Sequence, residues 1–168
     1  MAISHGTWAV TDRIALNQAI NVTSTTQAHP IGMRVKARDI GSTNYGEGEF
    51  IYLVGVASTA AGDAVVYDVS DGSTVRTVAA SKGPLGIAMS ANVASSYGWY
   101  QIHGLGVATA GTVVDNTPVY TTATDGTLDE SQVDANQVLG AFFRSASDTG
   151  LVKIGLTYPF AGADDQVT

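Results

Sequence analysis

Residues 50–68 read FIYLVGVASTAAGDAVVYD and residues 99–120 read WYQIHGLGVATAGTVVDNTPVY. The two segments are similar, so the middle of the chain contains an internal repeat. Each stretch is followed by an Asp-Gly dipeptide and then by a segment built around Leu-Gly, PLGIA in the first copy and VLGAF in the second. The offset between matching glycines grows along the repeat, which indicates a small insertion in the second copy. Two copies are too few for a solenoid and favour a duplicated β unit within one sandwich or barrel.

Short segments rich in β-branched and aromatic residues follow one another through both copies, separated by turns that contain glycine. This spacing is typical of all-β proteins, and we expect a compact β-barrel or sandwich, jelly-roll-like, built from the duplicated unit. Glycine in the turns supplies a positive φ without a steric penalty, and aspartate tolerates the same region. The expected strands are residues 31–37, 50–57, 64–69, 74–79, 85–91, 97–105, 112–120, 138–145 and 151–156, and residues 131–136 suit one helical turn.

The chain divides into three regions by pattern. Residues 46–160 are expected to form the β domain, with the repeats at about 50–98 and 99–156. Residues 1–45 lack a clear period of either type, so we expect an extended N-terminal arm with one or two short strands. Residues 161–168 are small and acidic and are expected to form a loose tail.

Composition excludes several classes of protein. Charged residues make up 14% of the chain, against about 25% in ordinary globular domains, which suits either a surface partly covered by partners or a β protein rich in threonine and serine. The net charge is −7 and the lysines are scattered, so we expect no nucleic-acid partner. There is no cysteine, which excludes disulfides and thiolate-bound metals. The longest apolar run is too short to cross a bilayer and no leader pattern is present, so we expect synthesis in a cytosol and no membrane partner.

No residue pattern typical of a catalytic or metal site stands out. The histidines at positions 5, 29 and 103 are far apart, and metalloprotease, nucleophile-elbow and phosphate-loop motifs are absent from the sequence. The loop Asp125–Glu130 offers oxygens that suit Ca²⁺, but it departs from the EF-hand pattern and Asp-Gly is first a turn signal. Glycoside hydrolysis requires a carboxylate pair whose geometry the sequence does not show, and Glu47 and Glu49, two residues apart at the end of a Gly-rich loop, occupy a position that is usually solvated. We expect no enzymatic activity and no cofactor.

A set of motifs carries a family resemblance. In order, they are ARD, GEGEFIYLVGVA, GPLGIAMSA, YGWYQIHG, VY followed by DGTLD, VLGA, and GLVKIGL, within residues 34–158. This set resembles the small cement or decoration proteins of tailed-bacteriophage capsids. The resemblance implies a β-rich structural protein, commonly a homotrimer, that binds the outside of the virion capsid. Such proteins hold neighbouring major capsid protein subunits together against the pressure of packaged DNA.

The candidate interface residues are aromatic or basic and lie in the first 45 residues or in the second repeat. We expect the capsid or subunit contact to involve Trp8, Arg13, Arg34, Lys36, Arg38, Trp99 and Tyr100. Residues 1–45 are expected to carry most of this contact. The runner-up interpretation is a phage fibre component or a carbohydrate-binding β module that uses Tyr52, Tyr97 and Trp99, and a hydrolase using Glu47 and Glu49 ranks third.

Overall fold

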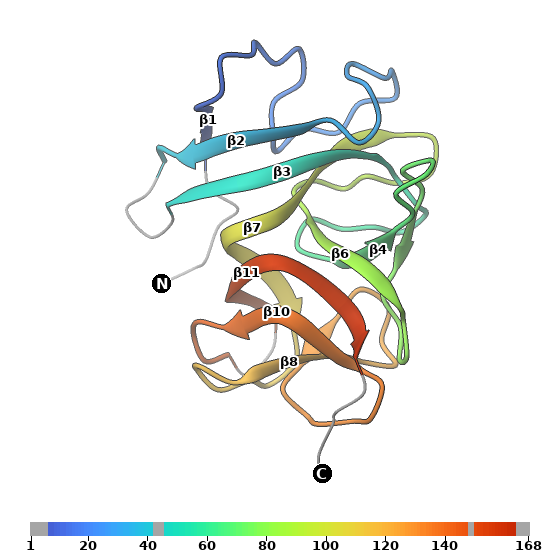
Figure 1. The fold of residues 1–168 in the computed structure, drawn as a ribbon, viewed down its shortest axis with the longest axis vertical. Helices are drawn as coiled ribbons and strands as arrows, with labels where there is room; N and C mark the ends of the chain where they lie inside the picture. Colours follow the sequence, from blue (N-terminus) through green and yellow to red (C-terminus); the bar gives the residue numbers. More distant parts are fainter. Residues whose placement is uncertain (1–6, 42–45, 148–149, 164–168) are drawn as a thin grey trace.

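The computed structural model describes residues 7–41, 46–147 and 150–163, and these residues confirm the all-β prediction (Figure 1). The strands are β1 (Trp8–Val10), β2 (Arg34–Asp39), β3 (Glu47–Val54), β4 (Ala64–Tyr67), β5 (Thr74–Arg76), β6 (Gly83–Ala88), β7 (Tyr97–Ala110), β8 (Pro118–Thr121), β9 (Leu128–Asp129), β10 (Gln137–Phe143) and β11 (Gly150–Ala163). Within the described residues no helix is long and apolar enough to span a membrane.

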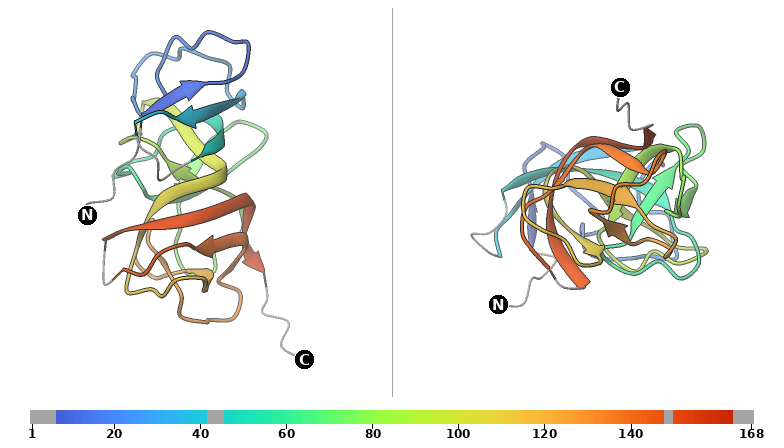
Figure 2. Two further views of the ribbon diagram at one scale, coloured as in Figure 1. Left: turned by 90° about the vertical axis from the view of Figure 1, so that its left-hand side faces the viewer. Right: turned by 90° about the horizontal axis from the view of Figure 1, so that it is seen from below.

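All described strands belong to one sheet that curls back on itself (Figures 1 and 2). Its order is β1-β2-β3-β7-β9-β8-β10-β11-β6-β4-β5, and β7 also pairs with β11 and β6. The pairings β7–β9, β9–β8, β8–β10, β10–β11 and β11–β7 therefore close a ring of strands, as in a small barrel. The long strand β7 passes from β3 at one end to β11 at the other and joins the two halves of the molecule.

Three clusters of buried side chains fill the interior. The largest lies inside the ring and includes Leu128, Phe143 and Ile154. The other two lie on opposite faces of the β3–β7 part of the sheet, one around Trp99 and the other around Tyr100. Neighbouring residues of a strand point to opposite faces, so these two side chains enter different clusters.

The burial of Trp99 and Tyr100 corrects their assignment as interface residues. Each side chain is 0% exposed, so neither contacts a partner in this conformation. Trp99 packs against Tyr52 with ring centroids 5.0 Å apart, and its indole N–H donates to the carbonyl of Gln18 at 3.2 Å. Burial raises the pKa of Tyr100 to about 12. Because β7 is covered on both faces, both residues belong to the core.

The N-terminal segment packs on the sheet, and its described residues do not form an extended arm. Gln18, Ile20 and His29 are buried, and Trp8 packs edge-on against Phe50 with centroids 4.8 Å apart. The Gln18 side chain accepts a hydrogen bond from the Tyr52 hydroxyl at 2.6 Å. This segment therefore completes the cluster around Trp99.

The pairing pattern of the first repeat recurs in the second. Strand β4 pairs antiparallel with β5 and β6, and β8 pairs antiparallel with β9 and β10. The two Asp-Gly turns also share a left-handed glycine, Gly72 at φ 71° and Gly126 at φ 73°. The pattern is what a duplication would produce, but descent from a duplicated unit stays a prediction.

Several expected boundaries differ from the structure. The segment predicted as strand 112–120 is mostly loop, because Asn116 adopts φ 64° and pairing resumes at Pro118. The segment 131–136 forms a turn and no helix. The last strand continues to Ala163, so the start of the predicted tail lies in the sheet, while residues 164–168 lie outside the described residues.

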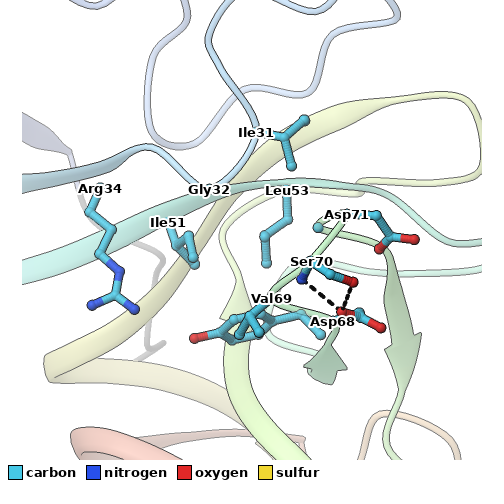
Figure 3. Close-up of a pocket in the computed structure, with 11 residues that line it drawn as sticks. Ile31, Gly32, Arg34, Ile51, Leu53, Asp68, Val69, Ser70 and Asp71 are labelled. Carbon is cyan, nitrogen blue, oxygen red and sulfur yellow. Dashed lines mark hydrogen bonds between the residues drawn. The ribbon is translucent and has the colours of Figure 1, made fainter.

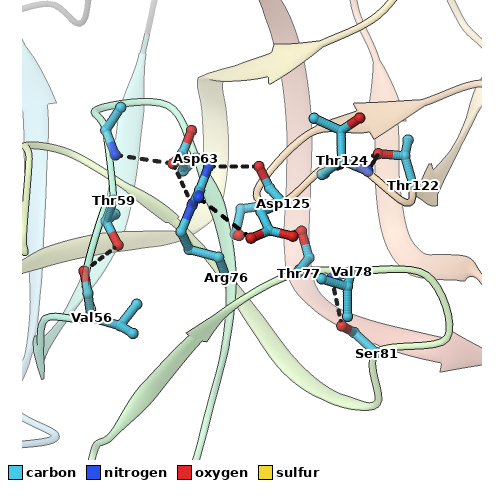
Figure 4. A network of polar contacts seen from close by, with 12 residues as sticks. Val56, Thr59, Asp63, Arg76, Thr77, Val78, Ser81, Thr122, Thr124 and Asp125 are labelled. Atoms are coloured by element: carbon cyan, nitrogen blue, oxygen red, sulfur yellow. Dashed lines mark hydrogen bonds and ion pairs between the residues drawn. The ribbon is translucent and has the colours of Figure 1, made fainter.

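An ion-pair network joins the two repeats (Figure 4). The Arg76 side chain donates to the Asp63 carboxylate at 3.0 Å and to the Asp125 carbonyl at 2.7 Å. Beside it, the Ala64 N–H donates to the Gly126 carbonyl at 2.9 Å. The Asp63 side chain is 5% exposed, so Arg76 neutralises a buried charge where the repeats meet.

Stability is expected to fall on mild acidification because of His29. Its Nε2 accepts a hydrogen bond from the Asn17 N–H at 3.2 Å, and burial lowers its pKa from 6.5. Between the lowered pKa and about 6.5 the unfolded chain binds more protons, so stability is full above that range and is lost as the pH falls through it. Urea unfolding from pH 7.5 to 5 will show a smaller loss in His29→Gln than in the wild type. Equal losses in both proteins would exclude His29 as the cause.

Candidate functional site: the outer face of the sheet

Three of the predicted basic residues lie together on β2. Arg34, Lys36 and Arg38 are exposed, and they alternate with the buried residues of the same strand. The alternation follows from the two-residue period of a strand, which places every second side chain on one face. The opposite face packs against the N-terminal segment. The basic side chains therefore lie on the side of the sheet away from Trp8.

Next to these bases, β3, β7 and β11 bring together an acid, a histidine and a tyrosine. Glu49 is the cross-strand partner of Lys36 on one side and of His103 on the other. Its carboxylate accepts a hydrogen bond from the Tyr158 hydroxyl at 2.8 Å and lies 3.8 Å from the Arg34 guanidinium. The hydrogen bond to Glu49 raises the pKa of Tyr158. A cavity of about 150 Å³ is lined by Lys36, Glu47, Gly48, Glu49, His103 and Tyr158.

Two irregularities in the strands create this arrangement. Tyr158 has φ 48° and Gly140 has φ 73°, and the β10–β11 register shifts between Leu139 and Ala141. A positive φ is unusual for a bulky residue, and strand bulges redirect side chains. The Tyr158 ring consequently lies over His103, with centroids 5.1 Å apart.

An open trough of about 440 Å³ continues the same surface across β7, β11 and β10. Gly104, Gly140 and Gly155 supply part of its lining as backbone, and the Arg144 side chain lies against Gly155. Phe142 is 45% exposed at its edge, and the Arg144 guanidinium lies 5.8 Å from the centre of the Phe142 ring.

We name this surface the outer face, which Figure 1 shows as the succession β2, β3, β7, β11 and β10. It is defined by Arg34, Lys36, Arg38, Glu47, Glu49, His103, Leu139, Phe142, Arg144, Tyr158 and Phe160. Among them Leu139, Phe142, Tyr158 and Phe160 are about half exposed, at 52%, 45%, 52% and 49%. A cluster of large exposed apolar side chains on a soluble surface is typical of an interaction site.

Arg34 also borders a second cavity, of about 220 Å³, beside the outer face (Figure 3). Its apolar wall is Ile31, Ile51 and Leu53, and its rim carries Asp68 and Val69. The rim is shaped by the Asp68 carboxylate, which accepts hydrogen bonds from the Ser70 N–H at 2.7 Å and from its hydroxyl, and these bonds lower the Asp68 pKa. The cavity is smaller than the ~300 Å³ at which small-molecule pockets usually begin.

The structure therefore groups the predicted site residues into three sets. Arg34, Lys36 and Arg38 share the outer face. Trp8 is half-buried on the other side of the sheet, and Arg13 is exposed in the N-terminal segment. Trp99 and Tyr100 are in the core.

Sequence reasoning missed Leu139, Phe142, Arg144, Tyr158 and Phe160. Tyr158 and Phe160 lie beyond the expected strand 151–156, so its alternation does not include them. The one available signal was the spacing Leu139, Phe142, Arg144, but the bulge at Gly140 breaks its two-residue alternation.

The loop considered for Ca²⁺ has its carboxylates engaged locally. Asp125 pairs with Arg76, and the Glu130 carboxylate accepts from the Val114 N–H at 2.6 Å. The described residues contain no group of three or more histidine or acidic side chains arranged to hold a metal ion.

A comparison with known protein families and with curated proteins found no match to this chain.

Proposed function

We propose that the protein is a structural component of a phage virion, which binds the outer surface of the capsid and cements neighbouring major capsid subunits. The observation that carries the proposal is the outer face, where aromatic, apolar and basic side chains are exposed on strands of one sheet. Tyr, Phe and Arg are enriched where proteins bind one another. The motif resemblance supports the capsid as the partner. In this proposal the protein acts as a homotrimer and has no enzymatic role.

The carbohydrate-binding alternative is less well supported, because of where its aromatic residues lie. Tyr52 and Trp99 are both 0% exposed, and Tyr97 packs against the same cluster. A sugar-binding platform needs accessible ring faces, which Tyr52 and Trp99 do not offer.

The proposal predicts that purified protein binds and stabilises capsids. Empty heads of the encoding phage, prepared without this protein, are mixed with it, sedimented and examined by calorimetry. We expect saturable co-sedimentation and a melting temperature of the heads several degrees above that of undecorated heads, because added contacts across subunits stabilise the assembled state. Heads that neither bind the protein nor melt later would contradict the proposal.

Deleting residues 2–20 is a poor test of the contact. Trp8, Gln18 and Ile20 contribute to the core, so the deletion would also remove buried packing around Trp99. Single exposed side chains are better targets.

A further inference from the structure

We propose that the outer face is the capsid-binding surface, and that it receives an apolar side chain flanked by carboxylates on the shell. This inference rests on the proposed function and adds which surface binds and what chemistry it recognises. It keeps Arg34, Lys36 and Arg38 of the contact that the sequence predicted, leaves out Trp8 and Arg13, and adds residues of β3, β7, β10 and β11.

Charge is the first argument for an acidic partner. The whole chain carries a net charge of −7, yet the outer face as defined holds four basic residues and two acids, leaving a local excess of positive charge. One of those acids, Glu49, already accepts the Tyr158 hydroxyl and lies beside Arg34. Lys36 and Arg38 are exposed and have no ion pair with another described residue. A basic surface on an acidic protein attracts carboxylates specifically to that side.

Shape is the second argument, and it concerns the trough. The trough has a volume of about 440 Å³, and its lining includes Phe142 and Arg144 beside backbone of β7, β10 and β11. Such a depression accepts an apolar side chain, which the Phe142 ring would cover, while the guanidinium of Arg144 would meet a carboxylate beside it. A central apolar anchor surrounded by charged contacts is the usual anatomy of a protein interface.

The same charges argue against pairing of this face with itself. A two-fold contact places identical patches of two copies together, so Lys36 and Arg38 would approach the basic residues of the second copy. Like charges brought together across an interface weaken it. A different, acidic surface is therefore the better fit.

The test compares variants of the outer face with matched controls elsewhere. Phe142→Asp and the double variant Lys36→Glu/Arg38→Glu alter the face. Val75→Asp repeats the apolar-to-acid change at a residue 59% exposed on β5, and Arg13→Glu repeats the charge reversal outside the face. Circular dichroism and melting of each free protein confirm that it folds.

Binding is measured by co-sedimentation with the undecorated heads at two salt concentrations. We expect both face variants to bind about tenfold or more weakly, as expected for loss of an interface anchor, and both controls to bind like the wild type. Added salt will weaken the binding of the wild type to the heads more than the binding of the double variant. Folded face variants that bind like the wild type would overturn this inference and leave the proposed function standing. A wild type that does not bind heads would overturn both.

Discussion

Replacing Trp99 with alanine will cost about 3–5 kcal/mol of folding free energy and lower the melting temperature by on the order of 10 °C. The side chain is completely buried and is among the largest in the core. It contacts both Tyr52 and His29, and its indole N–H is bonded to the N-terminal segment through the Gln18 carbonyl. The substitution therefore removes apolar contacts and leaves the Gln18 carbonyl without this donor.

Chemical unfolding followed by circular dichroism measures this loss. Trp99→Phe is the matched variant, because it keeps much of the packing but removes the indole donor. We expect its free energy of unfolding to fall by less than half as much as that of Trp99→Ala. Phe160→Ala is the surface control, since that ring is 49% exposed. A Trp99→Ala protein as stable as the wild type would show that the N-terminal segment does not pack on β7 in solution.

Replacing Arg76 with methionine is the second large effect, with an expected loss of about 3 kcal/mol. The variant keeps an unbranched apolar stem at this position but leaves the Asp63 carboxylate, 5% exposed, without its cation. It also removes the donor to the Asp125 carbonyl, so the turn of the second repeat loses a contact with the first. Removing one partner of a buried ion pair destabilises the fold by more than the intact pair stabilises it, because a buried charge is left unpaired.

A double-mutant cycle separates these effects. Asp63→Asn alone also destabilises, but adding it to Arg76→Met should recover part of the loss, because the buried carboxylate left without a cation is then removed. Arg13→Met is the matched control at an exposed arginine and should change stability by less than about 0.5 kcal/mol. Losses that simply add in the double variant would contradict a direct coupling between Arg76 and Asp63.

The strand pattern was largely readable from the sequence because local chemistry determines it. The turns at Gly72 and Gly126 need a residue with left-handed backbone conformation, which favours glycine. Polar and apolar residues alternate from Arg34 to Arg38, which indicates a strand with one covered face. The pairing between distant strands could not be predicted from the sequence. The double burial of β7 depends on residues 7–33 and on β4 and β6, and nothing near Trp99 or Tyr100 in the sequence reveals those partners.

The candidate site was half predictable for the same reason. The three bases of β2 were identified from their own segment. The aromatic half depends on the β10–β11 pairing and on the bulges at Gly140 and Tyr158, which shift the alternation by one residue. A pattern with a two-residue period assigns such side chains to the wrong face or to none.

Electron cryo-microscopy of heads saturated with the protein tests the central proposal most directly. The proposal predicts density in which the outer face, with Phe142, Tyr158 and Lys36, lies against the shell and meets acidic side chains there. Density in which this face points to solvent while another part of the protein contacts the shell would contradict it.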